Sequence, residues 1–325
     1  MLGGEFSAGR FASACSINLV KFQFGHFSQN ARGDYTVAVW SGQFDGENGS
    51  PFVEQVPLRY TRGMVRIMAV ANQKGGVGKT TTAINLGAAL AERGRRVLLI
   101  DLDPQASLTA SLGVDPYQVK SSTHGLLLED DSRLGSFLYP LGGDLWLAPA
   151  AVELAAAEFR LAHVKDRARR LKAALSRDLA GMEIILIDTP PSLGLLTVNA
   201  LSAASDLLIP VECQYLALRG VRSLLETTRL VHERLHPHLR LLGIVATMLH
   251  NESDNNRAVL RELRAVFGDK VFRSVVEYDD AVAMAPAARA SILRYKPGSP
   301  AAAGYRALAD EVLERWGEVQ PAPAG

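Results

Sequence analysis

A short glycine-rich segment that ends in Lys-Thr is the part of this sequence with the clearest chemistry. It runs Gln73-Lys74-Gly75-Gly76-Val77-Gly78-Lys79-Thr80. Its glycines allow several backbone N–H groups to converge on phosphate oxygens without interference from Cβ atoms. The lysine at position 79 is spaced to reach the β- and γ-phosphates of a nucleotide, and the hydroxyl of Thr80 to ligate Mg²⁺. The segment therefore predicts a phosphate-binding loop, although Gln73 occupies the position of the first glycine in the general pattern G-x-x-x-x-G-K-[ST].

Three aspartates stand at the ends of apolar segments that have the length of strands. Asp101 and Asp103 follow one such segment, and Asp188 follows the other, directly before Thr-Pro-Pro. Acids at the carboxyl edge of a parallel sheet face the ligand site, so we predict that Asp101 and Asp188 lie in the Mg²⁺ coordination shell. The alternatives are that one acid of the first pair only caps a helix begun at Pro104, and that Asp188 belongs to a purely structural turn.

The elements that must position these residues are indicated by the pattern from Met64 onward. Apolar segments of strand length alternate there with amphipathic segments of helix length, which predicts an α/β fold of the P-loop NTPase type. Its sheet is expected to be mostly parallel, twisted and covered by helices on both faces. We expect strands near 67–71, 97–100, 145–148, 184–187, 207–211, 241–247 and 271–276. We expect helices near 80–93, 152–179, 193–204, 218–235, 256–267 and 301–315.

The two ends of the chain differ from this pattern. Residues 1–63 show no sustained period, and we predict a flexible N-terminal extension or an over-extended start, with Met64 as the functional beginning. The alternative is a partner-binding or regulatory arm. The folded domain is predicted to span 64–316, and residues 317–325, which are rich in Pro, Ala and Gly, to form a disordered tail.

Composition narrows the classes of function. The formal net charge is only +1, so any binding of nucleic acid must use a local basic patch rather than a global field. The two cysteines, Cys15 and Cys213, form no CxxC pair, which argues against a disulfide framework, a zinc site or an iron–sulfur cluster. With no apolar run long enough to span a membrane and no signal-peptide pattern, we predict a cytoplasmic protein.

Residues Lys74–Thr81 resemble the deviant Walker A motif of the ParA/MinD family of ATPases. The likeness extends through about residues 64–248, where it is greatest to the ParA/Soj chromosome- and plasmid-partitioning proteins, and resumes at Gly298–Arg315. It implies a ParA-type ATPase domain over 64–316 that hydrolyses ATP with Mg²⁺. By this resemblance the nucleotide is bound by Lys74, Gly75, Gly76, Val77, Gly78, Lys79, Thr80, Thr81 and Met248.

The resemblance also implies roles for three residues in catalysis. Lys79 contacts the phosphates, and Asp103 positions the attacking water. Lys74 reaches across a homodimer to the phosphates held by the other subunit, so that two subunits complete one site. The implied function is an ATP-dependent switch that positions or segregates DNA. Its ATP dimer binds DNA non-specifically, and a ParB-like partner stimulates its slow hydrolysis. Such a protein is cytoplasmic and associates with the nucleoid.

After Met248 the sequence departs from the partitioning pattern. The position of a family arginine is held by Glu252, and Val276–Val282 lacks the two arginines of the corresponding family stretch. A basic patch for DNA remains available from other arginines, namely Arg257, Arg261, Arg264, Arg289 and Arg294. The alternative is a solvated surface, because acidic residues are interspersed. A nucleotide-gated regulator or organiser of a protein cargo, without DNA binding, is therefore the second hypothesis.

A membrane switch of the MinD kind is disfavoured by the end of the chain. Residues Leu313–Gly325 carry Glu314 and Glu318 and then prolines, in place of the basic amphipathic helix that such a switch inserts into the bilayer interface.

Overall fold

The computed structural model describes residues 65–214, 217–250 and 252–317, apart from the side chains of Ala217 and Arg219, and the backbone of three N-terminal strands. The chain divides into two compact units, Met1–Tyr60 and Thr61–Gly325. In the first unit, β1 (Phe27–Gln29), β2 (Tyr35–Phe44) and β3 (Pro51–Leu58) form an antiparallel sheet in that order. The predictions for residues 1–63 and 317–325 fall largely outside the described residues and stay predictions.

The second unit is built on a single eight-stranded sheet, in the order β11-β10-β9-β4-β8-β5-β7-β6. All neighbours are parallel except the antiparallel pair β6 and β7. Its strands are β4 (Arg66–Val70), β5 (Val97–Asp101), β6 (Tyr139–Gly142), β7 (Leu145–Ala148), β8 (Ile184–Asp188), β9 (Asp206–Glu212), β10 (Arg240–Leu249) and β11 (Val271–Glu277). The predicted α/β fold with a mostly parallel sheet is confirmed, and of the eight strands of this sheet only the edge strand β6 was not predicted.

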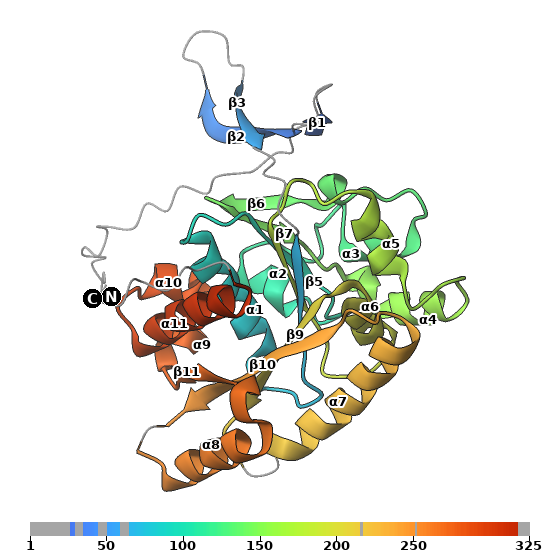
Figure 1. Cartoon of the computed structure of the whole chain (residues 1–325). Coiled ribbons are helices and arrows are strands. Elements are labelled where there is room, and N and C mark those ends of the chain that lie inside the picture. The colour runs from blue at the N-terminus through green and yellow to red at the C-terminus, as the bar shows by residue number, and fades with distance from the viewer. Residues whose placement is uncertain are drawn as a thin grey trace, which may run out of the picture. The chain divides into compact units, whose positions relative to one another are not determined.

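Helices cover both faces of this sheet, which is why its central strands are apolar along their whole length. Every residue of β5 and of β8 is buried. On one face, α1 (Lys79–Ala91) packs against α11 (Pro300–Arg315), and on the other α6 (Leu195–Ala203) packs between α5 (Arg170–Arg177) and α7 (Ala217–Arg234) (Figure 1). None of the described helices is long and apolar enough to cross a membrane.

The prediction of one continuous helix over 152–179 was wrong. The segment contains a 3₁₀ turn (Val152–Ala156), α4 (Ala157–Ala162) and α5, separated by a loop. In that loop Asp166 has a φ of 54°, a left-handed conformation that ends a right-handed helix. The guanidinium of Arg167 donates to the carbonyl of Ala162 at 2.8 Å and so satisfies a helix-end acceptor. Basic residues crowded between 165 and 172 disfavour a continuous helix by like-charge repulsion.

Several short helices were also absent from the sequence prediction, because they have too few residues to show a period. They are α2 (Ser107–Ser111), α3 (Thr123–Leu128), α9 (Asp280–Met284) and α10 (Ile292–Tyr295). The predicted helix at 256–267 begins two residues earlier, as α8 (Asp254–Phe267), because the Ser253 hydroxyl accepts from the N–H of Asn256 and caps it.

Candidate nucleotide-binding site

The glycine-rich segment connects the end of β4 to the first turn of α1 at the carboxyl edge of the sheet. Gly76 and Gly78 have φ angles of 75° and 82°, which favour glycine at both positions. Gly78 directly precedes α1, so the free N–H groups and the positive dipole end of this helix lie at the loop. The loop therefore has the geometry of an anion-binding turn, as the sequence predicted.

Side chains from the sheet hold this loop in place. The amide of Asn72 donates to the carbonyl of Pro210 at 2.8 Å, and its oxygen accepts from the N–H of Lys74 at 3.0 Å. The hydroxyl of Thr247 donates to the carbonyl of Val77 at 2.9 Å. Asn72 and Thr247 were missed by the sequence analysis, although both are polar residues at the ends of otherwise apolar strands and both are buried.

Met248 was predicted to contribute to nucleotide binding, and the structure places it beside the loop. Its backbone has a φ of 51°, and its Cε lies 3.4 Å from the position that a Cβ on Gly78 would occupy. Any side chain at position 78 would therefore be strained by its backbone conformation, and its Cβ would contact Met248.

Lys79 is buried, with 7% of its surface exposed, among the predicted acidic residues. Its ammonium donates to the carbonyl of Lys74 at 3.3 Å. Burial lowers the pKa of Lys79, while the nearby carboxylates of Asp188 and Asp103 act in the opposite direction. A buried ammonium that donates to an uncharged backbone carbonyl would gain a stronger, charged acceptor when a phosphate binds.

Asp188 ends β8 and lies opposite Asp101 in the register of β5 and β8. One of its carboxylate oxygens accepts from the Thr80 hydroxyl at 2.7 Å, and the other is buried without a hydrogen-bond partner. Burial, and next the charge of Asp101, raise the pKa of Asp188 well above its ordinary range. An orphaned, fully buried carboxylate oxygen is strongly disfavoured unless a cation compensates it.

This donor set fits Mg²⁺. Among the described residues, no group of three or more His, Cys, Asp or Glu side chains is arranged to hold a metal by itself. That agrees with Mg²⁺, which usually takes one or two protein oxygens and completes its shell with waters and substrate phosphates. Thr80 and Asp188 offer such oxygens at the end of the phosphate loop.

Asp101 is fully buried, and the structure uses both of its oxygens inside the protein. One accepts from the N–H of Asp103 at 3.1 Å, and the other accepts from the N–H and hydroxyl of Thr109 at 2.9 and 2.6 Å. Burial raises the pKa of Asp101 to about 6, although these hydrogen bonds act to lower it. Asp101 thus organises the loop 102–109 that presents Asp103, and its predicted contact with Mg²⁺ stays a prediction.

Asp103 is 8% exposed, and one of its oxygens accepts from the N–H of Gln105 at 2.9 Å. This contact closes a local turn over Pro104, while the helix α2 begins only at Ser107. Neither acid of the pair therefore caps a helix that begins at Pro104. The second oxygen of Asp103 accepts no hydrogen bond from the described residues, as expected of a carboxylate that is available to a ligand or a water.

The five arginines predicted as a DNA patch are divided between α8, which carries three of them, and other parts of the chain. Arg257, Arg261 and Arg264 are exposed along α8, whereas Arg294 belongs to α10 and Arg289 packs against Gly113. The structure therefore supports a basic stripe on α8 more than one patch of five.

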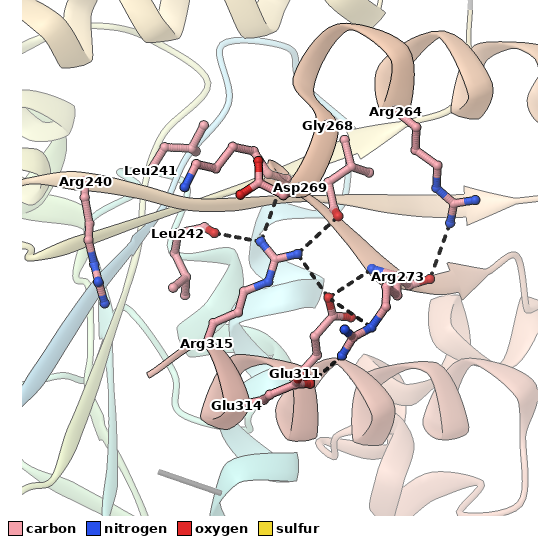
Figure 2. A pocket seen from close by; sticks show the side chains of 12 residues that line it. Arg240, Leu241, Leu242, Arg264, Gly268, Asp269, Arg273, Glu311, Glu314 and Arg315 are labelled. Atoms are coloured by element: carbon pink, nitrogen blue, oxygen red, sulfur yellow. Dashed lines mark hydrogen bonds and ion pairs between the residues drawn. The ribbon is translucent and has the colours of Figure 1, made fainter. Parts of the chain in front are cut away.

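Arg264 also lines a pocket of about 560 Å³ at the amino-terminal ends of β10 and β11 (Figure 2). Arg273 there pairs with Glu314, and Arg315 donates to Glu311 at 3.0 Å. Arg240, on the same rim, donates to Asp206 at 2.7 Å. The cations that line this pocket are thus largely neutralised by neighbouring carboxylates, which makes it a poor second anion site.

Replacement of Asp188 by asparagine is expected to stabilise the nucleotide-free protein at pH 8 by about 0.5–2 kcal/mol, because it removes a buried charge and keeps an oxygen for Thr80. A carboxyl group whose folded pKa is raised costs stability as the pH rises from its unfolded pKa through its folded pKa. The gain should therefore shrink as the pH falls toward 5, because the raised pKa of the wild-type carboxyl favours its uncharged form as the pH decreases. Urea unfolding at the two pH values measures it.

A matched control is Asp206→Asn. This second buried aspartate accepts from Arg240 and from the Ser205 hydroxyl at 2.7 and 2.8 Å, so its replacement should destabilise the protein. If Asp188→Asn also lowered the free energy of unfolding at pH 8, the buried charge of Asp188 would not be destabilising the wild-type protein.

Comparison with known proteins agrees with this geometry. The family model described as an AAA domain matches residues 65–241. The sporulation initiation inhibitor protein Soj of Bacillus subtilis is 41% identical over 249 residues, which cover 77% of this chain and 98% of that protein. The chromosome-partitioning ATPase Soj of Thermus thermophilus is 44% identical over 254 residues, covering 78% and 98%.

A solved structure with a different name matches comparably. The cobyrinic acid a,c-diamide synthase of Mycobacterium smegmatis, with bound ADP and magnesium, has a TM-score of 0.69 and 40% identity, covering 78% of this chain and 96% of that one.

Proposed function

Because this chain belongs to the ParA/Soj family of P-loop ATPases, we propose that it is an ATP-dependent dimerising switch that positions or segregates DNA, as in chromosome or plasmid partitioning. The observation that carries the proposal is the placement of two lysines, Lys74 and Lys79, on one glycine-rich loop that faces the carboxylates of β5 and β8. This arrangement occurs in a chain that covers 98% of each of the two Soj relatives, one of which is a chromosome-partitioning ATPase.

In the proposed reaction the residues from Gly75 to Thr81 bind the ATP phosphates. Lys79 offsets charge on the β- and γ-phosphates, and Met248 contributes beside the loop. Thr80 and Asp188 would hold Mg²⁺, which when bound neutralises charge on the phosphates. Asp103 orients the attacking water, and Asp101 fixes the loop that carries Asp103. This transfer depends on positioning and charge, so no nucleophilic side chain is needed.

Lys74 has its role between subunits in this proposal. It reaches the phosphates bound by the other subunit, so ATP links nucleotide state to dimerisation. Hydrolysis is slow, and a ParB-like partner accelerates it and so releases the dimer. The proposal places the protein in the cytoplasm, associated with the nucleoid while the ATP dimer holds DNA.

The DNA-binding step is supported by the stripe on α8. Arg261 has no acidic partner among the described residues, and Arg264 donates only to the carbonyl of Arg273, at 3.5 Å.

A specific observation favours the second candidate, a nucleotide-gated organiser of a protein cargo. Glu252, after β10, stands where the family places an arginine, and the uncharged residues Tyr278 and Ala281, after β11, stand where it places two more.

Titration of duplex DNA with ATP, with ADP and without nucleotide separates the two candidates. We expect binding only with ATP, stronger at low than at moderate salt because phosphate contacts release counterions. Arg261→Ala should weaken it and lower the salt slope by about 1, whereas Arg229→Ala, an exposed arginine on α7 that pairs with Glu233, should not. An ATP-bound dimer that binds no DNA at either salt would favour the protein-cargo candidate.

The diamide synthase named among the solved structures suggests an amide-forming reaction. An amide synthase that takes ammonia from glutamine through a thioester needs an activated cysteine. Within the part of the chain that the structure describes, the cysteine is Cys213, which is buried, with its pKa raised to about 11 by burial. Such a thiol is unsuited to nucleophilic attack, so the described residues favour the partitioning candidate.

A further inference from the structure

Lys74 is held by an ion pair on its own subunit. Its ammonium lies 2.8 Å from a carboxylate oxygen of Glu212, the last residue of β9, and 3.5 Å from the side-chain oxygen of Gln214. The two charged side chains are partly exposed, Lys74 by 38% and Glu212 by 18%. In the proposed function this lysine contacts the phosphates of a second subunit. In the single subunit it already forms an ion pair with Glu212.

The surrounding backbone fixes this pair. Asn72 ties the N–H of Lys74 to the end of β9, since its side chain also donates to Pro210, two residues before Glu212. The Lys79 ammonium donates to the carbonyl of Lys74. On the other side, α7 passes so closely that a Cβ on Gly220 would lie 3.2 Å from the Asn72 side-chain oxygen and 3.8 Å from the Lys74 Cβ. These contacts fix the backbone position of Lys74, from which its side chain reaches Glu212.

We propose that Glu212 is a positioning residue that retains Lys74 on its own subunit, so that pairing of two subunits must first break this ion pair. The inference rests on the proposed function, in which Lys74 acts across the dimer. Lys74 then has two competing anions, the single charge of Glu212 and the several charges of the triphosphate in the other subunit. Glu212 raises the ATP and protein concentrations at which the dimer forms.

The size of the effect follows from the exposure of the pair. Ion pairs in partly exposed settings make modest contributions, so removal of the Glu212 charge should change the dimerisation constant by about 2- to 5-fold. The amide of Gln214 remains as a weaker, uncharged acceptor at 3.5 Å and would not replace the carboxylate.

The test compares full-length wild-type protein with Glu212→Gln, which keeps the side-chain shape and removes the charge. Sedimentation in saturating MgATP should show a dimer dissociation constant about 2- to 5-fold lower in the variant. In a Lys74→Ala background the same substitution should change nothing, because the lysine that it frees is absent. A structural role for Glu212 would not produce this dependence on Lys74.

Further controls separate the possible outcomes. Glu92→Gln removes a carboxylate that accepts from Arg306 at 2.7 Å, outside the loop, and should leave the dimer constant unchanged. Glu212→Ala serves as a second variant if Glu212→Gln shows a lowered melting temperature. Unchanged or weaker dimerisation of both Glu212 variants, with a wild type that dimerises in ATP, overturns the inference alone. A wild type that binds ATP and stays monomeric overturns the proposed switch itself.

Discussion

Replacement of Lys79 by alanine is expected to lower the affinity for MgATP by about 100-fold or more, which is the largest binding effect that we expect from a single substitution. The side chain of Lys79 is buried, and its ammonium donates to the carbonyl of Lys74 at 3.3 Å. A triphosphate would supply charged acceptors to a donor that has already lost its water. Without Lys79, one positive charge fewer would offset the carboxylates of Asp188 and Asp103 beside the phosphates.

Titration calorimetry with a non-hydrolysable ATP analogue and Mg²⁺ measures this effect. Lys79→Met should behave like Lys79→Ala, since it keeps the length of the side chain and removes only the charge. Lys270→Ala, an exposed lysine on the opposite edge of the sheet, should bind like wild type. Binding by Lys79→Ala and Lys79→Met within a few-fold of wild type would mean that the phosphates do not lie at this loop.

The parts of the site that the sequence predicted are those whose chemistry is local. The glycines at 76 and 78 stand where the backbone takes positive φ, and the lysine that follows is fixed by the start of α1. The central strands were predicted because both of their faces are buried, which requires unbroken apolar runs. Asp101 and Asp188 were predicted at the ends of two apolar strands, and the register of β5 and β8 shows that these strands are neighbours and that the two acids lie opposite each other.

The parts that were missed depend on contacts between distant positions or on a single backbone angle. The helical composition of 152–179 gives no sign that Asp166 adopts a left-handed conformation, so one helix was predicted where two were found. The partner of Lys74 lies 138 residues away, on a different strand. Likewise, two acids at a strand end do not show which one faces inward, whereas the structure directs both oxygens of Asp101 toward Asp103 and Thr109.

Asp101 and Asp103 thus have different roles, and the largest effect on turnover is expected from replacement of Asp103. Asp103→Ala should retain ATP and lower the rate of hydrolysis by about 100- to 1,000-fold, since Asp103 is the carboxylate with an oxygen left for the attacking water. Alanine also removes the acceptor for the Gln105 N–H, so a loss of rate in this variant alone has two explanations. Asp103→Asn separates them, because an amide oxygen keeps the turn and lacks the carboxylate charge.

We expect Asp103→Asn to be as slow as Asp103→Ala in single-turnover hydrolysis, with ATP affinity within about threefold of wild type in both. Asp115→Asn is the matched control. Asp115 forms the same kind of turn, in which its side chain accepts from the N–H of Tyr117 at 3.0 Å, on the exposed surface. That variant should hydrolyse ATP at the wild-type rate. Wild-type turnover in Asp103→Asn would reduce Asp103 to a turn-forming residue and leave the positioning of the water to another group at the edge of the sheet.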